Sequence, residues 1–316
     1  ILVRYDRTNL IFLSQLLRSF PSIDAFTVLI TRGVQNDFCG LYHKSPVHVG
    51  ADESFRLFGT REVSSETSPP NALEDLVQWA RLQPTSTFAL IHIRDWHRLE
   101  DPEVASHFLK FGPHCVAHST GSQFVGNLFK GDQGNLGEHR IGSDGQWENC
   151  DSSLGENEYV VNVTSGISDV CGTGLEQLLN NIKEKARGFL LRVGVVGVST
   201  DFQVSNLLFD LQTRFQIKYL ATCSALTAAK SRRAHFAALD NIERYLDATV
   251  FHSISDFSFW LGPNKSTVHS PCNTSRTAPH GLIFSGTYSR DSGLESPPNG
   301  AASLPRASSA SNLEYS

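Results

Sequence analysis

The sequence lacks methionine altogether, and it lacks any apolar run of the roughly 18 residues that a membrane-spanning helix requires. We therefore expect no membrane segment and no membrane partner. Because even the first position is an isoleucine, we also expect the chain to be a fragment of a longer protein. Its cysteines show no CxxC or disulfide-framework spacing, which favours reduced thiols in a cytoplasmic protein (Cys39, Cys115, Cys150, Cys171, Cys223 and Cys272).

Positive charge is also scarce. The formal net charge is −5, and the one basic cluster, Lys230-Ser-Arg-Arg233, is short. A nucleic-acid-binding surface needs clustered lysine and arginine, so the composition argues against a nucleic-acid partner. Hydrophobic residues make up 40% of the 316-residue chain, which is enough to build the core of one domain with appendages.

Apolar runs alternate along the chain with amphipathic segments. The apolar, β-branched runs predict strands at 26–31, 87–93, 158–162, 190–196, 217–222 and 249–252. Helical spacing of apolar residues predicts helices at 69–82, 172–187, 201–214, 231–246 and 255–261. Such alternation is typical of a parallel sheet covered on both faces. We predict a three-layer α/β/α, Rossmann-like fold with a six-stranded parallel sheet, in which the strand at 26–31 is central.

The segments around this core differ in composition. Residues 1–25 contain an apolar helical pattern and are expected to form an N-terminal helical extension of the domain at 26–262. Within that domain, 126–157 is rich in Gly, Asp and Asn, which indicates a long loop or lid over the site. Serine, proline and glycine dominate 263–316, so we expect a largely disordered tail there.

Five sequence blocks hold most of the candidate functional residues. In chain order they contain Val34-Gln-Asn-Asp-Phe38, Asp95-Trp-His97, Pro113-His-Cys-Val116, Ser168-Asp-Val-Cys-Gly-Thr-Gly-Leu175 and Gly197-Val-Ser-Thr-Asp-Phe-Gln-Val204. In content and order these blocks resemble the motifs of the isochorismatase-like cysteine hydrolase superfamily, and most closely those of the nicotinamidases. The resemblance covers residues 26–261 and implies the same α/β fold.

The resemblance marks three positions at which the family's Asp–Lys–Cys catalytic triad is degenerate. Gly33 stands in place of the aspartate, Thr164 is the best match for the lysine, and Gln203 stands in place of the cysteine. A carboxamide cannot form the covalent acyl intermediate that a thiolate forms. Ser199 and Gln203 remain candidate binding residues, because a strand–turn–helix presents backbone N–H groups to a ligand. The family turn also implies a cis peptide between Val198 and Ser199.

A metal site is the second implication of the resemblance. The residues that match the nicotinamidase ligands are Asp95, His97, His107 and His114, of which His107 has the least regular spacing. Three imidazoles and a carboxylate at the end of a strand also suit Zn²⁺, Fe²⁺ or Mn²⁺ on chemical grounds. The open alternative is that these histidines satisfy local backbone groups.

Because all three triad positions have changed, the sequence favours a pseudoenzyme that binds a small molecule or a protein partner. Two alternatives stay open. The first is a nicotinamidase- or isochorismatase-type hydrolase that uses a bound metal and water on a C–N or ether bond. The second is a hydrolase in which Cys39 or Cys171 replaces the missing nucleophile. The resemblance also implies that the chain could assemble into a homo-oligomer.

Overall fold

The computed structural model describes residues 24–41, 44–58, 72–126, 128–129, 133, 136, 139–141, 147–149, 154–164 and 168–262. The expected tail at 263–316 lies outside these residues. The expected N-terminal helical extension at 1–25 also lies outside them except for its last two residues, where Asp24 is not helical and Ala25 already belongs to the first strand.

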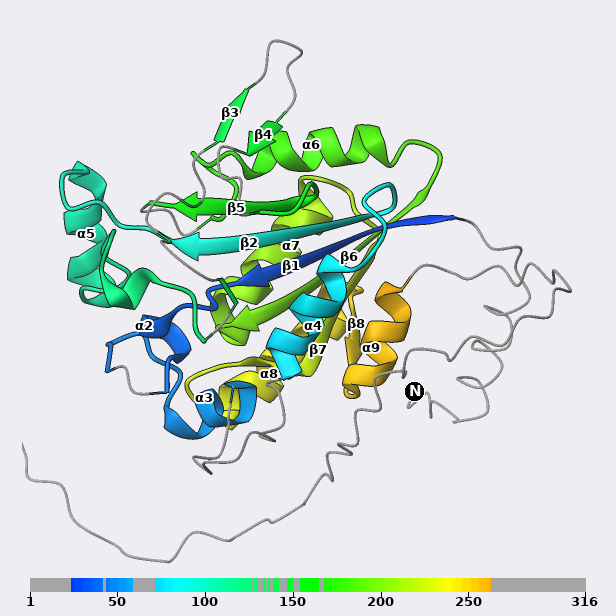
Figure 1. The fold of residues 1–316 in the computed structure, drawn as a ribbon. Helices are drawn as coiled ribbons and strands as arrows, with labels where there is room; N and C mark the ends of the chain where they lie inside the picture. The colour runs from blue at the N-terminus through cyan, green and yellow to red at the C-terminus, as the bar shows by residue number, and fades with distance from the viewer. Residues whose placement is uncertain are drawn as a thin grey trace, which may run out of the picture. The chain divides into compact units, whose positions relative to one another are not determined.

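The core is a six-stranded, all-parallel sheet (Figure 1). Side by side, its strands are β5 (Glu158–Val163), β2 (Phe88–Asp95), β1 (Ala25–Arg32), β6 (Leu190–Val198), β7 (Tyr219–Ala228) and β8 (Thr249–Phe251). Every residue of β1 and β2 is buried, as expected for central strands of a sheet that is covered on both faces. The predicted fold class and the central place of the strand at 26–31 are therefore confirmed.

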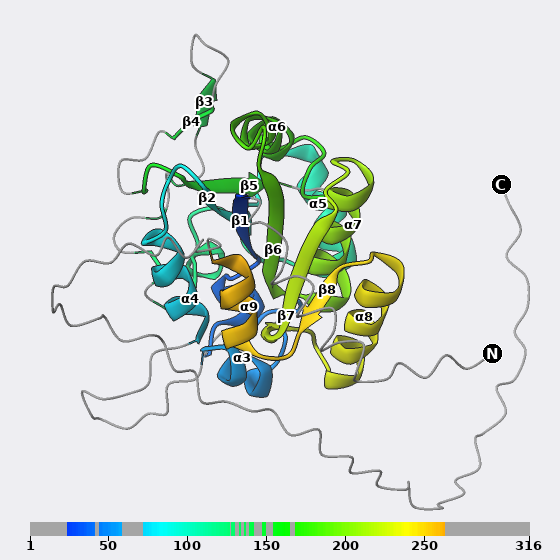
Figure 2. The same ribbon diagram turned by 90° about the vertical axis from the view of Figure 1, so that its right-hand side faces the viewer.

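Helices cover both faces of the sheet (Figure 2). One face carries α6 (Leu175–Lys185), α7 (Ser205–Thr213) and α8 (Arg232–Tyr245), and the other carries α3 (Ala51–Phe58), α4 (Ala72–Arg81) and α9 (Ile254–Leu261). Phe26, Val28 and Ile30 of β1 pack against the first group, whereas Leu29 packs against the second. This alternation follows from the two-residue period of a strand. Among the described residues, no helix has both the length and the apolarity needed to cross a membrane.

Among the described residues, sequence patterns did not predict three α-helices, a short hairpin within 126–157 and the end of one strand. The helices are α2 (Asn36–Cys39), α3 and α5 (Pro102–Phe111), and β7 continues to Ala228 beyond the predicted end at 222. The first two helices are short, at four and eight residues, so each has too few turns for apolar periodicity to be recognised. In helix α5 the apolar residues Val104, Phe108 and Phe111 have helical spacing, but only Val104 is buried.

The chain order creates a switch point between β1 and β6. From β1 the chain builds β2 and β5 on one side, and then returns to the other side of β1 to form β6, β7 and β8. In open parallel sheets, a crevice for ligands lies at the carboxyl ends of strands flanking such a reversal. Gly33 follows β1 and Ser199 follows β6, so both lie at this point.

The segment expected to be a lid is described only in part. It contains an antiparallel hairpin of β3 (His139–Ile141) and β4 (Trp147–Asn149). The Arg94 guanidinium at the end of β2 donates to the carbonyl oxygens of Gln133 and Leu136, at 2.9 and 2.7 Å. These bonds attach the middle of the segment to the edge of the sheet beside β5.

Close contact between β1 and β6 requires a glycine at position 197. Gly197 has φ +118°, and a Cβ placed there would lie 2.1 Å from the carbonyl oxygen of Arg32. Gly188 also has a positive φ, +92°, but a Cβ there would meet nothing within 4 Å. We expect Gly188→Ala to cost about 1–2 kcal/mol of unfolding free energy, the usual cost of a left-handed residue.

We expect Gly197→Ala to cost at least about 3 kcal/mol, because the strands must also separate to relieve the clash. Urea denaturation of the two variants and the wild type measures both values. Equal losses in the two variants would show that the β1–β6 contact does not need this glycine.

Candidate functional site

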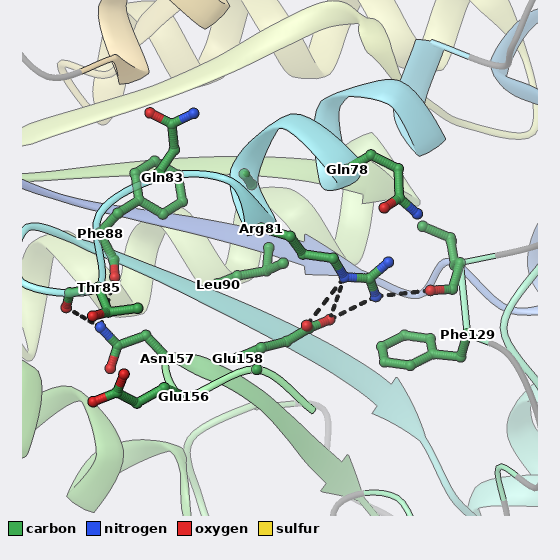
Figure 3. Close-up of a pocket in the computed structure, with 13 residues that line it drawn as sticks. Gln78, Arg81, Gln83, Thr85, Phe88, Leu90, Phe129, Glu156, Asn157 and Glu158 are labelled. Carbon is green, nitrogen blue, oxygen red and sulfur yellow. Dashed lines mark hydrogen bonds and ion pairs between the residues drawn. The ribbon is translucent and has the colours of Figure 1, made fainter. Parts of the chain in front are cut away.

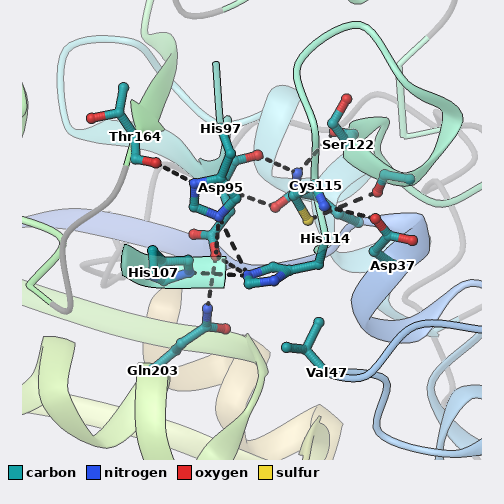
Figure 4. A network of polar contacts seen from close by, with 12 residues as sticks. Asp37, Val47, Asp95, His97, His107, His114, Cys115, Ser122, Thr164 and Gln203 are labelled. Carbon is teal, nitrogen blue, oxygen red and sulfur yellow. Dashed lines mark hydrogen bonds and ion pairs between the residues drawn. The ribbon is translucent and has the colours of Figure 1, made fainter. Parts of the chain in front are cut away.

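Three histidines converge at the carboxyl end of β2. His97 follows that strand, His107 lies on α5, and His114 follows α5 (Figure 4). The Nε2 atom of His114 lies 3.3 Å from Nε2 of His97 and 3.3 Å from Nε2 of His107. One nitrogen from each ring falls within 4.8 Å of the other two. The structure thus brings together three of the four predicted metal ligands, including the one with irregular spacing.

The other ring nitrogens explain why these Nε2 atoms face one another. Nδ1 of His114 lies 2.7 Å from the carbonyl oxygen of Gly112, and Nδ1 of His97 contacts the carbonyl oxygen of Thr164. A neutral imidazole that donates from Nδ1 keeps its lone pair on Nε2. Two lone pairs 3.3 Å apart repel unless a proton or a cation lies between them. A tetrahedral ion with Zn–N bonds of about 2.0–2.1 Å would separate its ligands by roughly 3.3 Å, so the cluster fits such an ion.

Asp95, the fourth predicted ligand, ends β2 beside the histidines. Its Oδ2 atom lies 3.7 Å from Nε2 of both His97 and His114. The Gln35 side chain holds the Asp95 backbone on both sides, accepting from its N–H and donating to its carbonyl oxygen, each at 2.7 Å. The carboxylate is therefore fixed at the edge of the cluster, where it could complete a three-histidine, one-carboxylate ligand set.

A buried arginine next to this carboxylate was missed by the sequence analysis. Arg32, the last residue of β1, donates from Nη2 to Asp95 Oδ1 at 2.7 Å and from Nε to both Asp169 oxygens at 2.8 and 2.9 Å. All three side chains are at most 5% exposed. An arginine at the end of an apolar strand was the available signal, because a buried charge needs a partner. The sequence did not identify Asp169 as that partner.

The ion pairs control the charge of the buried groups. Burial alone would lower the pKa of Arg32, but the two carboxylates raise it above its ordinary value. Burial would likewise raise the pKa of Asp95, yet the Arg32 guanidinium and the neighbouring histidines hold it well below the usual range. The pKa of Asp169 is raised, because its burial outweighs the attraction of Arg32.

The three positions that the resemblance matches to the family's triad lie around the same cluster in different ways. The Gln203 carboxamide donates to Asp95 Oδ2 at 3.4 Å, and its oxygen accepts from the Ser199 N–H at 3.1 Å. Gly33 lies against this carboxamide, since a Cβ added there would be 2.8 Å from Gln203 Oε1. Thr164 contributes its main-chain carbonyl oxygen rather than its hydroxyl, through the contact with His97.

The turn after β6 presents Gln203 to the site. The Val198–Ser199 peptide is cis, as the resemblance implied. The chain then forms a wide π-helical turn, η2 (Thr200–Val204), before α7 begins. Thr200 is held by a 2.9 Å hydrogen bond with His235 of α8. Within this turn Gln203 is buried, whereas Phe202 is exposed.

Neither cysteine proposed as a substitute nucleophile combines a reactive thiol with a position in the histidine cluster. Burial raises the pKa of the Cys39 thiol far above its ordinary value, and the same holds for Cys115, which follows His114. Cys171 is exposed, and its pKa is lowered by the Arg214 guanidinium 3.2 Å away. Cys171 contacts Arg214 and Ser168, neither of which belongs to the histidine cluster.

Aromatic side chains pack beside the cluster. The Phe111 ring lies 4.9 Å from the His107 ring and 6.0 Å from that of Phe202, measured between centroids. Phe108 lies 5.4 Å from His97. Phe202 remains 37% exposed. The polar cluster therefore has an apolar rim that suits the flat face of an aromatic ligand.

A separate cavity of about 510 Å³ lies between α4 and the start of β5 (Figure 3). Arg81 and Glu158 form an ion pair in it at 2.7 Å, and Glu158 also accepts from Nε2 of the buried His92 at 3.0 Å. Burial would raise the pKa of Glu158, but His92 and Arg81 lower it to about 2. The polar groups of this network are paired with one another. The histidine cluster, where ring nitrogens from three side chains converge, is the better candidate for a functional site.

The Arg32 ion pairs predict a large and specific loss of stability. Replacing this arginine would leave two carboxylates buried without their cation, which typically costs about 3–5 kcal/mol. We expect Arg32→Met to lose that amount. Arg187→Met is the matched control, because the Arg187–Glu184 pair is 79% and 66% exposed and such pairs contribute at most about 1 kcal/mol. Urea denaturation measures both variants, and comparable losses would contradict the structural role of Arg32.

The Glu158 network predicts acid sensitivity. Its pKa is about 2 in the folded chain and 4.5 ordinarily, so its stabilisation is complete above pH 4.5 and is lost as the pH falls towards 2. The wild type should lose about 2–3 kcal/mol more than Glu158→Gln over this window. Urea denaturation between pH 5.5 and 2.5 tests this, with Glu176→Gln as control because that side chain is 57% exposed. Parallel profiles for wild type and Glu158→Gln would refute the assignment.

Comparison with known proteins places the fold. No family model and no curated protein matches the sequence. Among solved structures, an isochorismatase-like hydrolase from Alkaliphilus metalliredigens is 19% identical with a TM-score of 0.50, and the match covers 75% of this chain and 100% of that one.

Two further matches have lower TM-scores. A nicotinamidase/pyrazinamidase from Bacillus subtilis is 16% identical with a TM-score of 0.48, covering 72% of this chain and 99% of that one. A pyrazinamidase from Pyrococcus horikoshii, solved in complex with zinc, is 14% identical with a TM-score of 0.46, covering 73% and 98%. The resemblance found in the sequence is therefore confirmed at the level of the fold, which is that of the isochorismatase-like hydrolases.

Proposed function

We propose that this chain is a catalytically degenerate, isochorismatase- or nicotinamidase-like protein that binds a divalent metal ion and a small ligand without hydrolysing it. The observation that carries the proposal is the position of Gln203. Its carboxamide lies where the resemblance places the nucleophile, and both of its polar ends are hydrogen-bonded within the site.

The missing chemistry supports the absence of hydrolysis. Amide cleavage of the family type requires a thiolate nucleophile, a base to accept its proton and a nearby cation. Gln203 has no comparable nucleophilicity, and Gly33 supplies no base. A side chain cannot simply be restored at position 33, because φ there is +64° and a Cβ would lie 2.4 Å from the Val198 carbonyl oxygen. Arg32 does provide a buried cation, but the carboxylates of Asp95 and Asp169 already neutralise it.

The converging donors support metal binding. His97, His107 and His114 would hold a Zn²⁺, Fe²⁺ or Mn²⁺ ion, with Asp95 as a fourth ligand. Bound there, the ion would supply a Lewis acid for a ligand atom such as a pyridine nitrogen. The aromatic rim formed by Phe108, Phe111 and Phe202 favours a small planar ligand over a protein partner.

Elemental analysis tests the metal site. After growth in medium supplemented with zinc, iron and manganese, we expect about one ion per chain in the wild type. His114→Ala should reduce this to near zero, since His114 contacts both other histidines. His252→Ala is the matched control, because His252 is exposed and its ring contacts Ser224 instead of the histidine cluster. A metal-free wild type, or an equal loss of metal in both variants, would show that the three histidines have only a structural role.

Activity assays test the proposed loss of catalysis. We expect no measurable hydrolysis of nicotinamide or isochorismate by the wild type. Gln203→Cys alone should also stay inactive, because a thiol without a base keeps a pKa near 8.5. Hydrolysis by the wild type that survives thiol alkylation would instead favour the metal-and-water hydrolase. Hydrolysis abolished by alkylation would favour a substitute cysteine.

A further inference from the structure

The Gln203 carboxamide is held at both ends by groups that a ligand would otherwise use. Its oxygen accepts from the Ser199 N–H at 3.1 Å, and its nitrogen donates to Asp95 Oδ2 at 3.4 Å. The side chain is buried, with the residue only 7% exposed. Because amide oxygen accepts and amide nitrogen donates, this pairing also fixes which way the carboxamide points.

The space around the carboxamide is shaped to receive it. Gly33 has no side chain, and a Cβ there would lie 2.8 Å from Gln203 Oε1, closer than real Cβ contacts allow. The π-helical turn η2 (Thr200–Val204) directs Gln203 inward, while its neighbour Phe202 remains exposed. A donor, an acceptor and a side-chain-free wall thus form a seat for one planar amide group.

We propose that Gln203 is a built-in occupant of this seat, and that a chain lacking its side chain binds a small primary carboxamide there instead. In the wild type, Gln203 excludes carbonyl ligands from the Ser199 N–H. The residue therefore determines the specificity of the site. This inference rests on the proposed function, because it concerns which ligands the same site can bind.

The chemistry of the seat selects an amide over similar groups. Gln203→Ala removes a fragment equivalent to acetamide, which can accept from Ser199 and donate to Asp95 as the lost side chain did. Acetate has the same shape but would place a second negative charge beside Asp95. Acetone has the acceptor but no donor, so it would leave the Asp95 contact unmade.

The test is a titration of purified full-length Gln203→Ala with acetamide, acetate and acetone. We expect acetamide to raise the melting temperature and to shift the Ser199 amide resonance, saturating in the millimolar range because so small a ligand has limited binding energy. Acetate and acetone should bind at least about tenfold more weakly, a difference of roughly 1.4 kcal/mol. The wild type should show no saturable response.

Gln212→Ala is the matched control. This glutamine lies on α7, and its amide donates to the Leu246 carbonyl oxygen at 2.8 Å, away from the histidine cluster. Acetamide should not stabilise this variant. Equal stabilisation of wild type, Gln212→Ala and Gln203→Ala would overturn the proposal, and so would a folded Gln203→Ala that binds acetamide no better than acetate.

Should Gln203→Ala fail to fold, hydrogen exchange in the wild type decides the question. The proposal requires slow exchange of the Ser199 amide proton and of the Gln203 side-chain amide protons, because each donates within the buried site. Rapid exchange of these protons would overturn it.

Running the acetamide titration with a chelator and again with added zinc separates the two proposals. Acetamide binding in a chain that takes up no metal would support the occupant role while refuting the proposed metal-binding function. Metal uptake without selective acetamide binding would support the proposed metal-binding function while refuting the occupant role of Gln203.

Discussion

The buried Arg32 guanidinium is the interaction on which the rest of the site depends. It joins the end of β1 to Asp95 at the end of β2 and to Asp169 ahead of α6. Two carboxylates this deeply buried would otherwise be driven to protonate. With the arginine in place, Asp95 stays ionised and turns its second oxygen towards the histidines and Gln203. The ion pairs therefore set both the charge and the geometry of the cluster.

Gln203 and Gly33, which the resemblance matches to triad positions, pack together as one unit. The carboxamide of Gln203 fits because Gly33 has no side chain, and it points as it does because the Ser199 N–H and the Asp95 carboxylate hold opposite ends. Positive charge in the site comes from Arg32, one residue before Gly33.

Sequence alone could predict the parts of this protein that local patterns encode. Unbroken apolar runs marked the six strands, and the resemblance of the motifs indicated which histidines to examine. Pairings between distant residues were not predictable, because Arg32 and Asp169 lie 137 positions apart and no local pattern joins them. The hydrogen bonds of Gln203 were missed for another reason. They depend on how far a carboxamide reaches across a turn, which only atomic geometry reveals.

Asp95 also links the histidine cluster to the occupied seat. Its Oδ1 is engaged by Arg32, so Oδ2 alone faces both the histidine nitrogens and the Gln203 amide. A cation drawn to this oxygen would withdraw electron density from the same atom that accepts from Gln203, and would weaken that 3.4 Å contact. The Ser199 contact would be unaffected, since its N–H meets the other end of the carboxamide. If the cluster holds a cation, its occupancy and the retention of Gln203 in its seat would therefore be coupled through one carboxylate oxygen, and such coupling would be reciprocal.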